Sequence, residues 1–238
     1  MSRVSVCMAT YNGENFIGQQ LESILVQLDS TDEIIISDDS SSDRTVEIIK
    51  SYNDTRVIIL ENNKFKSPIF NLENALKHAT GTVIFLSDQD DIWLPGKVKV
   101  MREHLRHYDL VVSDASLIDA SGRIVEDSYF KLRGSGPGFI KNIYRNSYLG
   151  CCMAFNRMIL EKSLPFPAKI PMHDMWLGLI AEISGRTFFC EEKLLYYRRH
   201  SSNASPTAIG KSCYKALDMI KFRYNLLMAL TKRYLLDK

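Results

Sequence analysis

The stretch Val83-Ile84-Phe85-Leu86-Ser87-Asp88-Gln89-Asp90-Asp91-Ile92-Trp93 organises the interpretation of the whole chain. Its apolar first half, rich in β-branched and aromatic residues, predicts a buried strand with three carboxylates just past its carboxyl end. Ligands bind at that end of open α/β sheets. Crowded carboxylates repel one another unless a cation lies among them, and oxygen ligands suit Mg²⁺ or Mn²⁺, which also bind phosphate. The stretch therefore predicts a divalent metal site, with a solvated acidic loop capping the next helix as the alternative.

Upstream of this strand, short apolar runs alternate with amphipathic helices. The expected strands are 4–9, 33–37 and 57–60. A helix follows each of them, and Ser67-Pro68 marks the start of the third helix as its cap and first-turn proline. This alternation predicts an α/β fold with a mostly parallel, doubly wound sheet. The polar segments 10–13 and 38–43, which follow the first two strands, would then meet Asp88 and its neighbours at one edge of the sheet.

Downstream, the pattern is less regular and predicts a smaller, mixed β region. The expected elements are a helix over 95–108, a strand over 110–113, a hairpin over 115–125, a strand over 150–155, a helix over 173–183 and a strand over 194–197. The hairpin is expected to turn at Ser121-Gly122. The glycine-rich segment 134–138 is expected to form a loop without regular structure.

Composition and charge narrow the class of protein. The 238 residues, 45% hydrophobic and 24% charged, suit one large domain with a small extension. Residues 211–238 contain seven Lys or Arg and two Asp, so this tail carries +5 and leaves −3 of the total +2 for residues 1–210. Basic charge confined to a tail argues against binding of DNA or RNA. The odd number of cysteines suggests no disulfide framework and suits a reducing cytoplasm.

No secretory leader is expected, and no apolar run approaches the roughly 18 residues of a membrane span. The tail nevertheless has a rough helical stripe of apolar residues among its basic ones. The residues of the stripe are Leu217, Ile220, Tyr224, Leu227 and Leu235. Three readings remain open for this helix: it packs back on its own domain, contacts a second copy in a homodimer, or lies on an anionic membrane surface.

Three segments at predicted strand ends carry a family resemblance. They are Ala9-Thr10-Tyr11-Asn12-Gly13, Ser37-Asp38-Asp39-Ser40-Ser41-Ser42-Asp43 and Ser87-Asp88-Gln89-Asp90-Asp91-Ile92-Trp93. Together they resemble the inverting, nucleotide-sugar-dependent glycosyltransferases of family two, which have the GT-A fold, and especially the bacterial polysaccharide branch of rhamnosyl- and glucosyltransferase-like enzymes. The resemblance covers about residues 3–203. It implies a glycosyltransferase domain over 1–205, with a nucleotide-binding half over about 1–113 and an acceptor-binding half over 114–205, followed by a basic helical extension over 206–238.

The resemblance also implies how the donor nucleotide sugar binds. Thr10, Tyr11 and Asn12 would line the pocket for base and ribose. Asp39 would accept hydrogen bonds from the base or the ribose, as suits an acceptor-only side chain. For the segment 38–43 as a whole, helix capping is the alternative.

Asp88 and Asp90 match the DxD motif of the family. The resemblance implies that Asp90 ligates a divalent ion, Mg²⁺ or Mn²⁺, while Asp88 contacts the ribose or the metal with its water shell. Such an ion stabilises the departing nucleotide diphosphate as a Lewis acid. Asp91 is either a second ligand or a cap of the following helix. Near the last predicted strand, Arg199 would grip a donor phosphate and His200 would join the metal.

Asp174 matches the catalytic aspartate of the family, at a helix start where many relatives have Glu-Asp and this chain has His173-Asp174. The helix N-terminus favours the ionised carboxylate, which can then accept a proton from an acceptor hydroxyl. An ordinary helix cap is the alternative. His173 would either orient Asp174 or compete with it as the base, and Trp176 would either stack on an acceptor sugar or pack in the core.

The expected function is transfer of a sugar from UDP-hexose or dTDP-rhamnose to a saccharide or lipid-linked saccharide in bacterial surface polysaccharide synthesis (O-antigen, capsule or exopolysaccharide). The enzyme is expected in the cytoplasm, either free or peripheral on the inner membrane. Two alternatives remain. A sugar-nucleotide nucleotidyltransferase would need a Gly-rich basic loop where Thr10-Tyr11-Asn12-Gly13-Glu14 stands. A catalytically silent sugar- or nucleotide-binding module would have little use for both Asp90 and Asp174.

Overall fold

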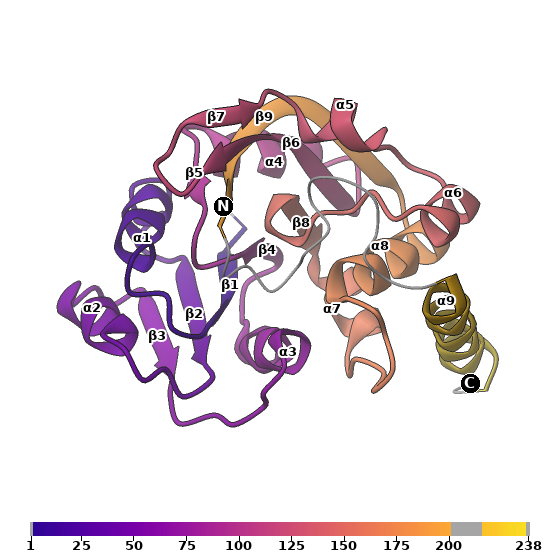
Figure 1. The fold of residues 1–238 in the computed structure, drawn as a ribbon, viewed down its shortest axis with the longest axis horizontal. Helices are drawn as coiled ribbons and strands as arrows, with labels where there is room; N and C mark the ends of the chain where they lie inside the picture. Colours follow the sequence, from indigo (N-terminus) through magenta and orange to yellow (C-terminus); the bar gives the residue numbers. More distant parts are fainter. Residues whose placement is uncertain (1, 201–215, 237–238) are drawn as a thin grey trace.

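A computed structural model describes residues 2–200 and 216–236 of the chain. Within them, nine strands form one sheet in the order β3-β2-β1-β4-β8-β6-β9-β5, with β7 beside β6 (Figure 1). The strands are β1 Val4–Thr10, β2 Glu33–Asp38, β3 Val57–Leu60, β4 Val83–Ser87, β5 Ile92–Trp93, β6 Leu110–Asp119, β7 Ile124–Glu126, β8 Met153–Asn156 and β9 Thr187–Arg199.

Helices cover both faces of this sheet, with α1 and α4 on one side and α3, α7 and α8 on the other (Figure 1). They are α1 Ile17–Leu25, α2 Thr45–Ser51, α3 Pro68–His78, α4 Lys97–His104, α5 Tyr129–Arg133, α6 Phe139–Tyr144, α7 Arg157–Ser163, α8 His173–Ser184 and α9 Ala216–Thr231. A 3₁₀ turn, Gly150–Cys152, precedes β8, and a π-helical turn, Lys232–Leu236, follows α9.

The first half of the sheet is regular. Strands β3, β2, β1 and β4 are parallel neighbours, and the register sets Thr10 beside Asp38. The apolar residues of β1, β2 and β4 are almost fully buried, as expected of strands covered on both faces, whereas those of the edge strand β3 are only partly buried. Gly81 is required before β4, because a Cβ there would lie 2.7 Å from the carbonyl oxygen of Arg3. The predicted α/β fold and the four strand positions are confirmed in this half.

The second half is mixed, as predicted, but several elements differ from expectation. β8 is antiparallel to both β4 and β6, while β6 and β9 are long parallel neighbours. The strand predicted at 194–197 begins at Thr187, and the one predicted at 110–113 continues to Asp119. The segment 150–155 opens with the 3₁₀ turn, so its strand starts only at Met153. The hairpin is confirmed, with Gly122 at φ +85° in its turn.

The short helices α5, α6 and α7 were not predicted from the sequence. The helix predicted at 95–108 is shorter, because α4 runs from Lys97 to His104. Segment 134–138 has no regular structure, as expected, and it joins α5 to α6. These short helices lie at the side of the sheet where α8 and α9 gather (Figure 1).

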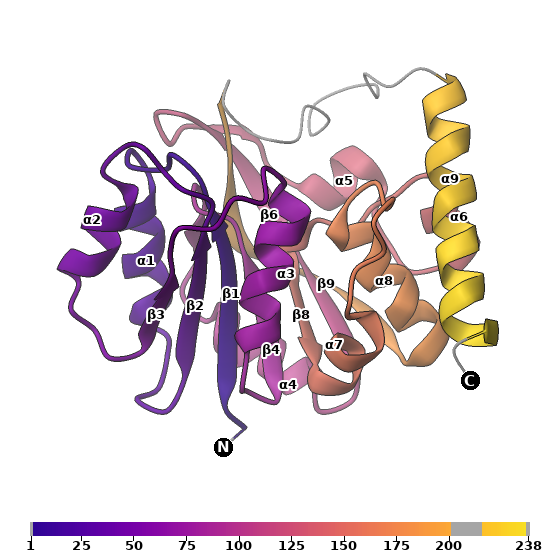
Figure 2. The ribbon, with the colours of Figure 1, turned by 90° about the horizontal axis from the view of Figure 1, so that it is seen from below.

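Helix α9 lies at the edge of the molecule beside α6 and α8 (Figure 2). Leu226 and Leu230 are buried against the domain, so the reading in which the tail packs back on its own domain is confirmed. The Arg233 guanidinium reaches the carbonyl oxygens of Lys162 and Leu164. No helix in the described part of the chain has the length and apolar character needed to cross a bilayer. The boundary expected at 205/206 lies outside the described residues.

Candidate active site

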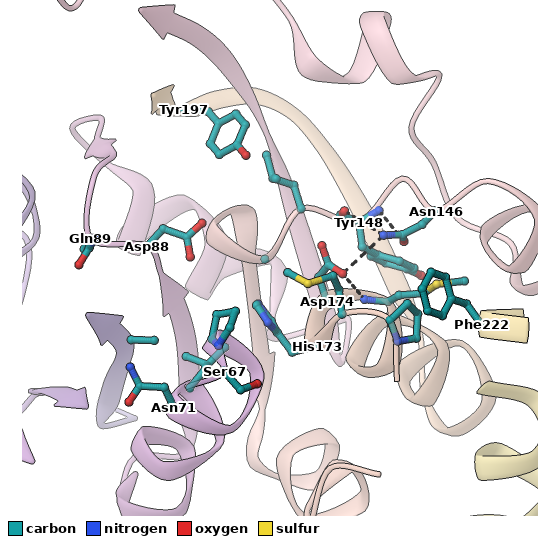
Figure 3. A pocket seen from close by; sticks show the side chains of 18 of the residues that line it. Ser67, Asn71, Asp88, Gln89, Asn146, Tyr148, His173, Asp174, Tyr197 and Phe222 are labelled. Carbon is teal, nitrogen blue, oxygen red and sulfur yellow. Dashed lines mark hydrogen bonds between the residues drawn. The ribbon is translucent and has the colours of Figure 1, made fainter. Parts of the chain in front are cut away.

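A cavity of about 1150 Å³ opens where the carboxyl ends of β1, β2 and β4 meet the second half of the protein. Its walls carry Asp88 and Gln89 at one end, His173 and Asp174 in the middle, and Phe222 at the other end (Figure 3). Strand ends and a helix start that are far apart in the sequence therefore face one space.

The loop after β1 forms part of the first end. Thr10 and Tyr11 line the cavity. The Thr10 hydroxyl donates a hydrogen bond of 2.9 Å to Asp38, and the Tyr11 peptide exchanges two hydrogen bonds with the Gln89 side chain. Asn12 does not line the cavity. With φ +47°, it accepts a hydrogen bond from the Ser42 amide at 2.8 Å, so it joins the loops after β1 and β2.

The two aspartates in the loop after β2, Asp38 and Asp39, have different surroundings. Asp38 is buried and accepts hydrogen bonds from the Thr10 hydroxyl and from both the amide and the hydroxyl of Ser41. Asp39 lines the cavity and accepts one hydrogen bond, from the Phe65 amide at 2.6 Å. Asp38 therefore holds the loop together, while the Asp39 side chain is placed to meet a ligand.

The stretch after β4 presents Asp88, Gln89 and Asp90 to the cavity. Burial, together with the charges of Asp90 and Asp174, raises the pKa of Asp88 to about 7. Asp90 Oδ2 lies 2.8 Å from Nε2 of His200, whose ring stacks on Phe16. The mutual repulsion expected among these carboxylates is thus present in the folded protein, and a divalent cation would relieve it.

Asp91 is fully buried behind this end of the cavity. Its Oδ1 accepts a hydrogen bond from the Arg198 amide at 2.9 Å, and its Oδ2 has no hydrogen-bond partner. Burial and the charges of Asp90 and Asp88 raise its pKa well above the ordinary value. The helix-cap reading of Asp91 is wrong, because α4 begins after Gly96 and no side chain caps it.

The fully buried Lys97 lies beneath the same carboxylates. Its ammonium donates to the Cys151 carbonyl at 2.6 Å and lies 4.7 Å from the centre of the Trp93 ring. Asp91 and Asp88 act on Lys97 electrostatically, although burial outweighs them and lowers its pKa. Part of the cationic charge expected near the acidic stretch therefore comes from within the protein.

The end of β9 carries two arginines with different surroundings. Arg198 is buried and donates to the Asp90 carbonyl at 2.8 Å and to Gln19 at 2.8 Å, so it supports the acidic stretch from behind. Arg199 donates to the Tyr197 hydroxyl at 3.1 Å, and its guanidinium lies over the Tyr197 ring. Tyr197 lines the cavity, and Arg199 is not among the lining residues.

Asp174 occupies the first turn of α8. Its Oδ1 accepts a hydrogen bond from the Met175 amide and lies 3.5 Å from the Asn146 side-chain nitrogen (Figure 3). Burial raises its pKa to about 6, and hydrogen bonds that favour the anion partly offset the shift. The carboxylate is thus ionised at neutral pH yet holds a proton more readily than an ordinary aspartate.

His173 does not orient Asp174. Its ring lies against Gly150, where a Cβ would come within 2.7 Å of Nε2, and its Nδ1 is buried without a partner. Burial lowers its pKa to about 4, which makes it a weaker base than Asp174 at neutral pH. Trp176 is fully buried and donates to the Ser163 carbonyl at 2.9 Å, so it belongs to the core and cannot stack on an acceptor.

The far end of the cavity contains residues that sequence reasoning missed. Arg133, Arg145 and Arg223 line it together with Tyr144 and Phe222. They come from the end of α5, from the end of α6 and from α9. None of them stands in a recognisable motif, and the clustering of Lys and Arg in the tail was the only signal that pointed to Arg223.

Comparison with known proteins agrees with this arrangement. The family model described as glycosyl transferase family 2 matches residues 5–164. The chain belongs to glycosyl transferase family 2. The match spans the three loops at the first end of the cavity, after β1, β2 and β4, and stops before Asp174.

Two curated members of the family cover most of this chain. A UDP-Glc:α-D-GlcNAc-diphosphoundecaprenol β-1,3-glucosyltransferase of Escherichia coli, WfaP, is 31% identical over 86% of this chain and 80% of its own length. The dTDP-rhamnosyl transferase RfbG of Shigella flexneri is 29% identical over 91% of this chain and 80% of its own. Among solved structures, S. aureus TarS in complex with UDP-GlcNAc has a TM-score of 0.73 at 19% identity, covering 99% of this chain and 68% of TarS. The GT-A fold is thereby confirmed.

The residues at the first end suit a hard divalent ion. Asp88 and Asp90 offer carboxylate oxygens to the cavity, and His200 Nε2 lies beside Asp90. Among the described residues at this end, the ligand atoms of Asp88, Asp91 and Cys151 all lie within 4.8 Å of one another, so Asp88 and Asp91 are the carboxylates already close enough to share one ion. The raised pKa of Asp88 and the unpartnered Oδ2 of Asp91 indicate a local deficit of positive charge. This donor set fits the metal that a family 2 enzyme would use on a nucleotide diphosphate.

Proposed function

We propose that this glycosyltransferase is a metal-dependent, inverting hexosyltransferase. One observation carries the proposal: the Asp174 carboxylate and the Asp88–Asp90 pair face one cavity, close enough that the charge of Asp174 raises the pKa of Asp88. A proton acceptor and a site for the leaving diphosphate are thus held on either side of the space where a sugar can lie. Single displacement needs both groups at once.

In the proposed reaction, Asp174 accepts the proton of the acceptor hydroxyl as its oxygen attacks the anomeric carbon. The nucleotide diphosphate departs from the opposite face, and the configuration inverts. With a pKa of about 6, Asp174 is ionised at neutral pH and still basic enough to take the proton. The contacts from Met175 and Asn146 hold one carboxylate oxygen in place.

The donor would lie at the first end of the cavity. Thr10, Tyr11 and Asp39 are proposed to contact the base and ribose, with Asn12 fixing the loop from outside. Asp88, Asp90 and His200 would hold Mg²⁺ or Mn²⁺, which as a Lewis acid neutralises charge on the departing diphosphate. Arg199 would reach a phosphate only by leaving the Tyr197 ring.

The relatives suggest the substrates. The name of WfaP gives UDP-Glc as its donor and a diphosphoundecaprenol-linked sugar as its acceptor. The name of RfbG describes a dTDP-rhamnosyl transferase. We extend these to a UDP-hexose or dTDP-rhamnose donor and to a saccharide or lipid-linked saccharide acceptor in surface polysaccharide synthesis. A lipid-linked acceptor would bring the enzyme to the cytoplasmic face of the membrane. Residues 1–113 would form the nucleotide-binding half and 114–205 the acceptor-binding half.

A screen of nucleotide sugars tests this function. UDP-glucose, UDP-galactose, UDP-N-acetylglucosamine and dTDP-rhamnose are added with Mn²⁺ or with EDTA, and thermal stabilisation and donor hydrolysis are measured. One donor should raise the melting temperature and be hydrolysed only with the metal. If no donor is bound or hydrolysed, the chain is not a transferase of these sugars. Binding without any hydrolysis or transfer would instead favour a silent binding module.

A further inference from the structure

The far end of the active-site cavity differs in charge from the donor end. Arg133, Arg145 and Arg223 line it, and in residues 2–200 and 216–236 no carboxylate forms an ion pair with any of the three. Arg133 and Arg223 are half-buried and Arg145 is exposed, so two half-buried arginines and one exposed arginine line a cavity shared with Asp174 without a carboxylate partner among the described residues. Such a cluster fits a polyanionic group.

Two of the arginines are held ready for a ligand. Arg133 Nε is buried without a hydrogen-bond partner, and its Nη2 lies 3.5 Å from the Asn146 carbonyl. A buried donor left unpaired destabilises the protein, and an incoming acceptor atom would remove that cost. Arg223 donates to the carbonyls of Ile143 and Tyr144, and its guanidinium lies 5.7 Å from the Tyr144 ring centre. Its position is therefore fixed before any ligand arrives.

The cluster lies beside the proposed base. Asn146 is 3.5 Å from Arg133 through its carbonyl oxygen and 3.5 Å from Asp174 through its side chain. Arg133 and Asp174 thus both contact Asn146, so an anionic group bound at Arg133 would lie near Asp174. The attacked hydroxyl would then belong to a sugar attached directly to that anion.

Exposed apolar side chains lie on α6 and α9, the same helices that carry the cavity-lining Tyr144 and Phe222. Tyr144 on α6 is 77% exposed and Ile220 on α9 is 63% exposed, and Ile140, Tyr224 and Leu227 are exposed as well. Helix α9 is thus apolar on two sides, since Leu226 and Leu230 are buried against the domain. An exposed apolar surface that adjoins the mouth of a site indicates a binding surface.

We propose that this end of the cavity binds the diphosphate of a lipid-linked acceptor, with Arg133, Arg145 and Arg223 on the phosphates and the chain on the apolar surface of α6 and α9. Guanidinium groups bind phosphate through paired, charge-assisted hydrogen bonds, and the adjoining apolar surface accepts an alkyl chain. The assignment rests on the proposed sugar transfer, because the acceptor sugar must lie between the diphosphate and Asp174.

Binding of dodecyl diphosphate, below its micellar concentration and in EDTA, tests the assignment without sugar transfer. The chelator prevents metal-mediated binding at the donor end. Dodecyl diphosphate should bind at least about tenfold more tightly than inorganic pyrophosphate or dodecyl maltoside, since each of those lacks one half of the proposed contacts. If pyrophosphate binds as well as the dodecyl ester, the chain contacts are refuted; if the maltoside does, the phosphate contacts are refuted.

Variants locate the binding. Arg145→Ala should weaken dodecyl diphosphate binding by about tenfold, as should Arg133→Ala, whereas Arg133→Lys should recover part of the loss. Arg106→Ala, which removes an exposed arginine outside the cavity, is the matched control.

The pair Ile220→Ser and Tyr224→Ser should weaken binding of the dodecyl ester but not of pyrophosphate. Ile124→Ser, which changes an exposed residue of β7, should alter the binding of neither compound. Unchanged binding in Arg145→Ala and Arg133→Ala would overturn the proposal.

Vesicles of anionic phospholipid distinguish the acceptor from a membrane surface. If Ile220→Ser lowers vesicle binding while dodecyl diphosphate binding is unchanged, α9 contacts the bilayer instead and the assignment of the alkyl chain to α9 fails.

Donor binding and donor hydrolysis, measured without acceptor, separate failure of the proposed sugar transfer from failure of the proposed acceptor site. Absence of both donor binding and donor hydrolysis in the wild type would refute sugar transfer, whereas either of them without dodecyl diphosphate binding would refute only the acceptor site. In transfer assays, Arg145→Ala should raise KM for a lipid diphosphate acceptor.

Discussion

The two ends of the cavity are built differently. At the donor end, loops from three strands are tied to one another: Thr10 to Asp38, Asn12 to Ser42, and Tyr11 to Gln89. At the far end, arginines line the wall without carboxylate partners in the described residues, and apolar side chains are exposed. A site whose own polar groups are already paired keeps its shape, whereas unpaired groups gain most when a ligand arrives.

This contrast separates the residues whose loss should alter the fold from those whose loss should alter only binding or chemistry. The donor end depends on hydrogen bonds between loops, so changes there affect both stability and affinity. Asp174 stands between the two ends, and its loss should affect the chemical step and leave donor affinity nearly unchanged. The following variants test the division, starting with the largest effect.

Asp174→Asn should lower sugar transfer on the order of 10³-fold, because an amide cannot accept the proton of the acceptor hydroxyl. Donor binding should change less than twofold, since Asp174 lies beyond the donor end. Steady-state transfer and calorimetric titration of the donor measure the two effects. Asp127→Asn, an exposed carboxylate paired with Lys193 outside the cavity, serves as the control. A variant that keeps more than a tenth of the activity would exclude Asp174 as the base.

Asp90→Asn should lower transfer by roughly 10²-fold or more, as should treatment of the wild type with EDTA. In the presence of Mn²⁺, the variant should bind the nucleotide diphosphate more weakly than the wild type does. In EDTA the two proteins should bind it equally. Titration of the diphosphate under both conditions makes the comparison. If the variant binds the diphosphate more weakly than the wild type by the same factor in EDTA as in Mn²⁺, Asp90 contacts the nucleotide without a metal.

Asp38 and Asp39 form a matched pair within one loop. Asp38→Ala removes three accepted hydrogen bonds from a buried position and should lower the free energy of unfolding by about 2–4 kcal/mol. Asp39→Ala removes one, at the cavity wall, and should instead weaken donor binding about tenfold. Urea unfolding and donor titration separate the two. Equal effects on stability would mean that Asp39 has no special relation to the ligand.

The pH dependence follows from the raised pKa of Asp174. Below about pH 6 the carboxyl is protonated, so transfer should fall toward tenfold per pH unit on the acid side. Ionisation of Asp174 lowers the free energy of unfolding, whereas ionisation of a carboxylate paired with a cation raises it. The folded state favours the protonated form, so ionisation between the unfolded pKa near 3.8 and about 6 costs stability that stays lost above pH 6. Asp174→Asn should therefore be about 1–2 kcal/mol more stable than the wild type at pH 8 and no more stable at pH 3.5.

Much of the donor end was predictable from the sequence. Buried parallel strands are continuous apolar runs, so the ends of β1, β2 and β4 could be located, and with them the loops that reach the cavity. Asp174 was predicted at a helix start, and α8 begins at His173. The far end was not predictable. Helices α5 and α6 are five and six residues long, too short for a periodic signal, and the charged run Glu191 to Lys193 lies at a register shift that hid the true length of β9.

The sequence by itself determined the α/β class, the order of the early elements and the placement of acidic residues at strand ends, because hydrophobic periodicity reports local burial. Only the tertiary structure decided that Asp38 supports the loop while Asp39 faces the cavity, that Arg198 is a support for the acidic stretch, and that three arginines gather beyond Asp174. The physical reason is that a side chain's role depends on its partners, and these partners are distant in the chain: Arg198 and Asp91 are 107 residues apart. No local pattern encodes such a pairing; it arises when the sheet and its helices bring the segments together.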